Sequence, residues 1–150
     1  MPKVHRLDRL EMPDIEGMEP KLRAKVMRQA VKIVAVRSRE IVPVRSGKLK
    51  KSISYGVAQR GLQGKVKARK KYAPHAHLVH DGTRAHTIAP RTPEAARRAW
   101  MIYPGGRPVQ HPGARANPFF VQAAEEKRGE VEARMRQVAN EVLAEAAEGR

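Results

Sequence analysis

The hydrophobic pattern predicts one long helix in the first third of the chain. Between Pro20 and Ile41, apolar residues recur every three or four positions, and basic side chains occupy much of the remainder. This spacing is typical of an amphipathic helix. Proline is favoured in the first turn of a helix and stops one from within, so Pro20 suits the start and Pro43 the end. We expect a helix over residues 20–41 with a basic outer face.

Two shorter segments alternate apolar and polar residues with the period of a β-strand. Residues 52–57 and 65–68 lie on either side of a turn signal at residues 61–64, which contains two glycines. Alternating runs joined in this way are typical of a β-hairpin. Residues 42–49, with Pro43 and Gly47, read as a turn before the hairpin.

The second half of the chain contains fewer periodic segments. A short helix is expected from Pro74 to a C-terminal Gly82, and a short apolar strand over residues 99–103. Residues 83–98 and 104–118 are rich in proline, glycine or arginine and are expected to be long loops. From Pro118 to Glu148 the apolar residues again recur at helical spacing, which predicts a long C-terminal helix. Asn117 can cap this helix, and Pro118 can occupy its first turn.

These elements predict an α+β fold. A small antiparallel sheet would be packed by the long N-terminal helix and the long C-terminal helix. Length allows one domain, which we place at residues 20–150, preceded by an N-terminal arm at residues 1–19. We find no internal repeat.

Composition limits how large the core of such a domain can be. Leu, Ile, Val and Phe together number thirty of 150 residues, and twenty-one further apolar residues are alanine. A highly charged chain with so few large apolar side chains is close to the limit for independent folding. We therefore expect a protein that completes its core against a partner.

Charge is concentrated in one part of the chain. The net charge is +16, and residues 20–80 carry seventeen basic side chains but only one acidic side chain, Glu40. Residues 1–19 and 125–150 each carry a net charge of −2. A positive region of this kind attracts polyanions, so the partner is either nucleic acid or an acidic face of a neighbouring protein.

Eight side chains are the candidate contacts to DNA or to an acidic partner: Lys48, Lys50, Lys51, Lys65, Lys67, Arg69, Lys70 and Lys71. Such cations bind phosphates without reading sequence. Only Tyr55 and Tyr72 are nearby rings, too few for a single-strand or RNA-binding platform. A solvated basic face is the alternative interpretation.

A histidine cluster is the other chemical feature of the sequence. His75, His77 and His80 are followed by Asp81 and His86, but their spacing matches none of the known zinc motifs. Neighbours such as His80 and Asp81 are not expected to face each other. Because residues 20–124 hold only three acidic residues and no nucleophile or phosphate-binding motif, we expect no enzyme, no metal and no cofactor.

Other classes are excluded by what the sequence lacks. No apolar run approaches the roughly 20 residues that a membrane helix needs. The first residues lack the apolar segment of a secretory signal, and there is no cysteine for disulfides. The sequence therefore predicts a protein made in the cytosol, without a membrane partner.

Three motifs stand in order along the chain. Residues 42–53 contain Pro43, Ser46-Gly47, Leu49 and Ser52-Ile53; Tyr72-Ala73 precedes Val79 and Gly82-Thr83; and residues 111–120 end in Pro118-Phe119-Phe120. Over roughly residues 20–130 they resemble the Pro-x-x-(Ser/Thr)-Gly-x-Leu-x-x-Ser-Ile, Tyr-Ala…Val-Glu-x-Gly-Thr and Pro-Phe segments of tailed-phage neck and tail-completion proteins. One departure is that His80-Asp81 stands where many relatives have Glu followed by a small or aromatic residue.

The resemblance implies a structural virion protein of the head–tail junction. Such a protein forms a ring of identical subunits, a hexamer or else a dodecamer, that joins or caps the tail tube. Its partners would be copies of itself, the head-closure or connector protein, the tail-tube protein and, without sequence preference, packaged DNA. It would be assembled in the host cytoplasm and then reside in the virion.

The motif residues would have folding and interface roles in that protein. They are Gly47, Leu49, Tyr72, Gly82, Thr83, Pro118, Phe119 and Phe120. Gly47 would let the chain turn into the hairpin, Thr83 would bond back to the turn after Gly82, and Phe119-Phe120 would wedge beneath the last helix. Interfaces are expected at the arm, the 104–118 loop and the alanine-rich last helix.

Two other functions stay open at this stage. One is a non-specific nucleic-acid-binding protein, which rests on the basic span. The other is a metal-dependent hydrolase, which rests only on the histidine cluster.

Overall fold

The computed structural model describes residues 17–89, 92 and 108–148. The chain forms two compact units: Met1–Ala76 with Pro118–Arg150, and His77–Asn117. Helices and short antiparallel strands are both present, which confirms the α+β fold class. The predicted strand at residues 99–103 and most of the N-terminal arm lie outside the described residues.

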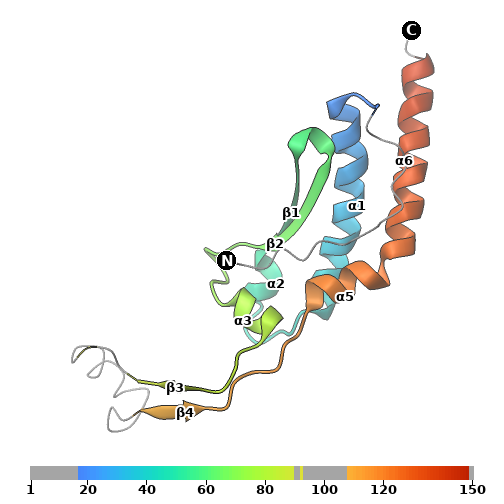
Figure 1. The fold of residues 1–150 in the computed structure, drawn as a ribbon. Helices are drawn as coiled ribbons and strands as arrows, with labels where there is room; N and C mark the ends of the chain where they lie inside the picture. Colours follow the sequence, from blue (N-terminus) through green and yellow to red (C-terminus); the bar gives the residue numbers. More distant parts are fainter. Residues whose placement is uncertain (1–16, 90–91, 93–107, 149–150) are drawn as a thin grey trace. The chain divides into compact units, whose positions relative to one another are not determined.

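Helix α1 (Pro20–Ile41) is the centre of the first unit, and its bounds confirm the prediction. Its buried residues are Val26, Met27, Ala30, Val31, Val34, Ala35 and Ser38. At 3.6 residues per turn these positions cover about half of the helix circumference. Figure 1 shows the reason: the hairpin packs on one side of α1, and the C-terminal helices pack on another.

The hairpin follows a short helix that the sequence pattern did not predict. Helix α2 (Lys48–Ser52) stands where a turn and the start of a strand were expected. Gly47 precedes it in the left-handed region, at φ 72°, and its carbonyl accepts a hydrogen bond from the Lys51 N–H. The Ser52 hydroxyl donates to the Leu49 carbonyl at 2.7 Å. These local bonds hold residues 48–52 in a helical turn, so the chain enters β1 one residue later than the predicted strand start at Ser52.

Strands β1 (Ile53–Ala58) and β2 (Gln63–Ala68) pair antiparallel from Ile53↔Ala68 to Ala58↔Gln63. A 3-10 turn, η1 (Gln59–Gly61), joins them. Gly64, expected in the turn, is instead a residue of β2. A Cβ at Gly64 would lie 2.2 Å from Val31 Cγ1 of α1, so the hairpin approaches the helix at a position without a side chain.

The expected single C-terminal helix is two helices. Helix α5 (Phe119–Glu126) and helix α6 (Arg128–Glu148) are separated at Lys127, where φ is −101° and ψ is 6°. The spacing from Ala124 to Val131 also fits an unbroken helix, so the break is not visible in the periodicity. It is decided by packing, because both helices lie against α1. Pro118 precedes the first turn of α5, and no side chain caps it.

The core between these helices is made of small and medium side chains. Val26, Met27, Ala30, Val31 and Val34 of α1 pack with a stripe from α5 and α6: Ala123, Ala124, Val131, Met135, Val138, Ala139 and Val142. No buried aromatic ring or leucine belongs to this cluster among the described residues. The alanines let α1 and α6 approach closely, and the core is thin, as the composition predicted.

The second unit contains strands where loops were expected. Helix α3 (Ala76–Asp81), strand β3 (His86–Ile88) and strand β4 (Val109–His111) are its elements. The strands pair antiparallel, His86↔His111 to Ile88↔Val109. They lie within the predicted loops at residues 83–98 and 104–118. Each strand is too short to show alternation, and its pairing partner is distant in sequence, so local patterns did not reveal it.

Two glycines bring the two chain segments together at the base of this ribbon. Gly82 (φ 72°) ends α3, as predicted, and a Cβ there would lie 2.6 Å from the Ala114 carbonyl oxygen. Gly113 (φ 89°) would place a Cβ 2.4 Å from the Thr83 carbonyl oxygen. Between them, Thr83 and Ala114 exchange two backbone hydrogen bonds. The approach is possible only because neither glycine has a side chain.

Within the described residues, no helix combines the length and apolar character needed to cross a membrane.

Candidate interaction surface

The outer face of the hairpin carries two uncovered lysines. In β2, Val66 packs on the core cluster, whereas Lys65 and Lys67 are exposed on the opposite face. Their partners across the ladder are Gly56 and Ser54, which are too small to cover them. The two-residue period of a strand thus places both ammonium groups on the same side of the sheet.

The other predicted cations gather at the open end of this hairpin. Ile53↔Ala68 is the last pair of the ladder, and beyond it the Arg69 N–H donates to the Ser52 carbonyl at 2.9 Å. This bond brings the end of α2, with Lys50 and Lys51, beside the turn that follows β2. We call the following exposed set the basic hairpin surface: Lys48, Lys50, Lys51, Lys65, Lys67, Arg69, Lys70 and Lys71.

No carboxylate of the described residues neutralises this surface. Residues 42–76 contain ten basic and no acidic side chains. Glu40, the nearest acidic residue in sequence, accepts a hydrogen bond from Arg37 at 3.0 Å. Within the described part of the chain, no ion pair includes a member of the surface. Lys71 Nζ lies 5.9 Å from the centre of the Tyr72 ring.

Motif residues occupy both buried and exposed positions. Leu49 is buried, and Tyr72 is half exposed beside Lys71. The Thr83 Oγ1 is buried and has no hydrogen-bond partner among the described residues, so the expected side-chain bond back to the turn is absent. Phe119 is completely buried, with its ring centre 4.3 Å from that of Phe120.

The histidine cluster is divided by the fold. His80 is buried, and its Nδ1 lies 2.8 Å from Asp81 Oδ1. The prediction that these neighbours do not face each other is therefore wrong, because Asp81 ends α3 and its short side chain can turn back. His86 instead stacks across the ribbon on His111, with ring centres 5.1 Å apart. The described residues contain no group of three or more side chains placed to hold a metal.

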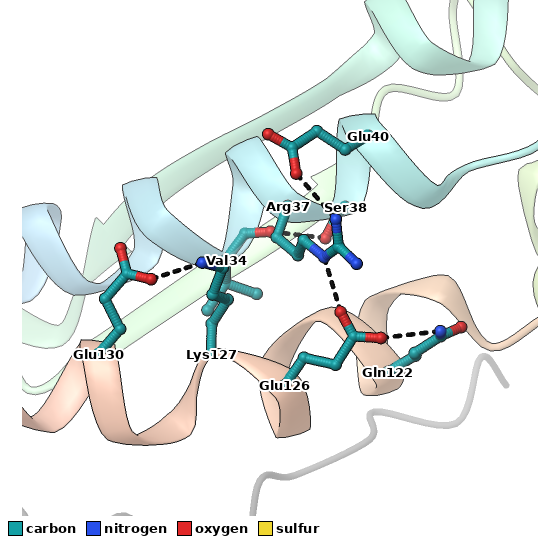
Figure 2. A network of polar contacts seen from close by, with 8 residues as sticks. All are labelled: Val34, Arg37, Ser38, Glu40, Gln122, Glu126, Lys127 and Glu130. Carbon is teal, nitrogen blue, oxygen red and sulfur yellow. Dashed lines mark hydrogen bonds and ion pairs between the residues drawn. The ribbon is translucent and has the colours of Figure 1, made fainter.

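A polar network that the sequence analysis missed joins α1 to α5. Arg37 Nε donates to Glu126 Oε2 at 2.6 Å, and Arg37 also binds Glu40. Figure 2 shows the guanidinium between the two carboxylates, with Gln122 donating to the other oxygen of Glu126 at 2.9 Å. Hydrogen bonds from Arg37, then from Gln122, hold the pKa of Glu126 below its usual value. The partners are 89 residues apart, so no local signal could have indicated the pair.

We expect this network to contribute stability that is lost in acid. Glu126 has a lowered pKa in the folded chain, so its contribution is complete above the ordinary glutamate pKa and disappears as pH falls through the lowered value. Arg37→Gln should therefore lower the urea midpoint at neutral pH and have a smaller effect in acid. Lys32→Gln, on an exposed position of α1, is the matched control. An Arg37→Gln effect that is independent of pH would contradict the prediction.

Comparison with known proteins gives one family match. Residues 12–82 match the family model described as "Bacteriophage HK97-gp10, putative tail-component". No curated protein and no solved structure matches the chain significantly.

The match confirms the resemblance to phage neck and tail-completion proteins over α1, the hairpin and α3. It includes the first sequence motif, the second as far as Gly82 but without Thr83, and the whole basic hairpin surface. The third motif, at Pro118-Phe119-Phe120, lies beyond it. A match to a phage tail component suggests a structural tail protein, a virion location and a non-enzymatic role.

Proposed function

We propose that this protein is a ring-forming subunit of the head–tail junction of a tailed phage, where it joins or caps the tail tube. The observation that carries the proposal is the match of residues 12–82 to a phage tail component. In this proposal the partners are further copies of the chain, the head-closure or connector protein and the tail-tube protein. A closed ring arises when one face of each copy binds a different face of the next.

Two features of the first unit favour assembly. Its helical core is built from valine, alanine and methionine, which leaves little apolar burial per residue. Large apolar side chains also remain on its surface, among them Val44, Leu62 and Leu143, which are 61%, 46% and 56% exposed. Leu143 lies near the end of α6, in the alanine-rich segment where the sequence analysis expects an interface.

Mass measurement tests the ring. We expect native mass spectrometry and light scattering of the purified protein to give a multiple of the 16.8 kDa subunit, six copies first and twelve as the second choice. Purified tail-tube protein should join the particle. A protein that stays monomeric alone and with tail-tube protein would overturn the proposal.

A single substitution sharpens this test. Leu143→Glu should lower the fraction of assembled particles while the circular dichroism spectrum stays unchanged, because the side chain is exposed in the subunit. Ala133→Glu adds the same charge earlier on α6, also at an exposed position, and is the control. Equal loss of assembly in both variants would assign the effect to charge and remove the end of α6 from the interface.

The alternative function is a non-specific nucleic-acid-binding protein that acts outside the virion. The uncompensated basic hairpin surface is the observation in its favour. It differs from the proposal in requiring neither a ring nor a tail-tube partner, so the same mass measurements separate the two.

A further inference from the structure

We propose that the basic hairpin surface binds the phosphate backbone of duplex DNA without reading its sequence. The ligand class is a double-stranded polyphosphate, held by Lys65 and Lys67 on the outer face of the hairpin and by the cations at its open end. The inference deepens the proposed function, because the head–tail junction is where packaged DNA would meet this surface. The binding itself depends only on the first unit.

Charge balance disfavours a second copy of the chain as the partner of this surface. Six carboxylates of the described residues already face a cation or a histidine: Glu40, Asp81, Glu126, Glu130, Glu141 and Glu145. Residues 1–16 add four acidic but also three basic side chains. The other four carboxylates of the described residues are Glu19, which precedes α1, and Glu125, Glu132 and Glu148, which are spread along α5 and α6. A second copy also carries a net charge of +16, so a polyanion matches eight exposed cations better than another copy does.

The side-chain types favour phosphate over a protein partner. Seven of the eight cations are lysines, a residue depleted in protein–protein interfaces, which are enriched in aromatic anchors. The outer face of the hairpin presents Ser54 and Gly56 beside its lysines, with no ring. Lysine acts as a flexible point charge that binds phosphate without a fixed partner geometry. An acidic protein could pair with these charges, but the outer face of the hairpin offers it no apolar side chain to bury.

The same surface favours duplex over single-stranded nucleic acid, and backbone over bases. Single strands are bound by rows of exposed rings. Here Tyr72 lies beside Lys71, and Tyr55, 36% exposed, pairs with Val66 and not with a lysine, so the described residues offer two separate rings and no row. Reading several different bases in the major groove needs a varied set of side chains, such as Asn, Gln and Arg, held in fixed geometry. The outer face of the hairpin instead carries Lys65 and Lys67 beside Ser54 and Gly56, and lysine is a flexible point charge. Contacts to the phosphate backbone remain, and these do not distinguish sequences.

Fluorescence anisotropy with a labelled mixed-sequence duplex tests the inference. We expect the logarithm of the binding constant to fall steeply with the logarithm of the salt concentration, because each phosphate contact contributes about 0.9 to the slope. The triple variant Lys50→Gln, Lys51→Gln, Lys67→Gln should reduce that slope by about 2 to 3 and weaken binding about 100-fold at 0.1 M salt.

A matched triple variant controls for net charge. Lys21→Gln, Arg28→Gln, Lys32→Gln also removes three positive charges, from exposed positions of α1. It should bind duplex within a few-fold of the unchanged protein. Equal loss in both triple variants would overturn the assignment to the hairpin.

Two further ligands test whether the surface binds phosphate without sequence preference or binds an acidic protein. A second duplex of different sequence should bind equally, and poly-glutamate should bind more weakly than duplex. Poly-glutamate binding as tight as duplex binding, or no duplex binding at 0.1 M salt, would overturn the proposal in favour of an acidic protein partner. Duplex binding by a chain that stays monomeric would contradict the ring alone, whereas a ring that does not bind duplex would contradict this inference alone.

Discussion

Replacing Gly64 with alanine should destabilise the protein strongly, whereas the same replacement at Gly56 should not. A Cβ at Gly64 would lie 2.2 Å from Val31 Cγ1 and 2.9 Å from Met27 Sδ. Methionine can move, but valine in a helix has one strongly preferred rotamer, and Val31 is buried. Forcing an extra methyl group into such a contact costs about 1 to 3 kcal/mol.

Gly56 is the matched control because it lies in the partner strand on the opposite face. A Cβ there would have no heavy atom within 4 Å. Gly56→Ala should leave the free energy of unfolding unchanged or raise it by up to about 1 kcal/mol, because alanine has fewer unfolded conformations to lose. Urea unfolding followed by circular dichroism measures both. Similar midpoints for the two variants would mean that β2 does not approach α1 as described.

Truncating Met135 should be the most costly change in the helical core. Met135 is 1% exposed and packs in the cluster between α1 and α6. Removing a buried side chain of this size costs about 2 to 5 kcal/mol through lost transfer energy and the cavity that is left. We expect Met135→Ala to lower the urea midpoint sharply, and a thin core gives few neighbours that can close the cavity.

Val36→Ala provides the comparison for Met135. Val36 is 43% exposed on α1, so its truncation should change stability by about 0.5 kcal/mol or less. Assembly adds stability with protein concentration, so both variants are measured over a range of concentrations. A Met135→Ala midpoint equal to that of Val36→Ala at the lowest concentration would contradict the packing of α6 on α1.

The elements with local signals were predictable from the sequence. Helix α1 has Pro20 at its start, a steady apolar stripe and Pro43 beyond its end, and its bounds agree with the prediction. The hairpin was predicted from alternation, although the first residue of the predicted strand, Ser52, ends α2 instead. Here a few local hydrogen bonds at Gly47 and Ser52 outweighed the pattern.

The elements that depend on distant residues were not predictable. Strands β3 and β4 have three residues each, and their pairing needs the close approach at Gly82 and Gly113. The break at Lys127 leaves the helical period intact, so only the packing of α5 and α6 on α1 shows it. The candidate surface divides in the same way. The alternation of residues 65–68 placed Lys65 and Lys67 on one strand face, but only the fold shows that Lys50, Lys51 and Arg69 lie together at the open end of the hairpin.

The sequence by itself determined the charge of the middle of the chain, the central helix, the hairpin and the resemblance to phage tail-completion proteins. These follow from residue types and from interactions between near neighbours. Only the tertiary structure decided that Arg69 meets Ser52 at the hairpin end and that Arg37 binds Glu126. Both contacts join residues that are separated in sequence, and they form when burial of the apolar stripe on α1 brings the elements together.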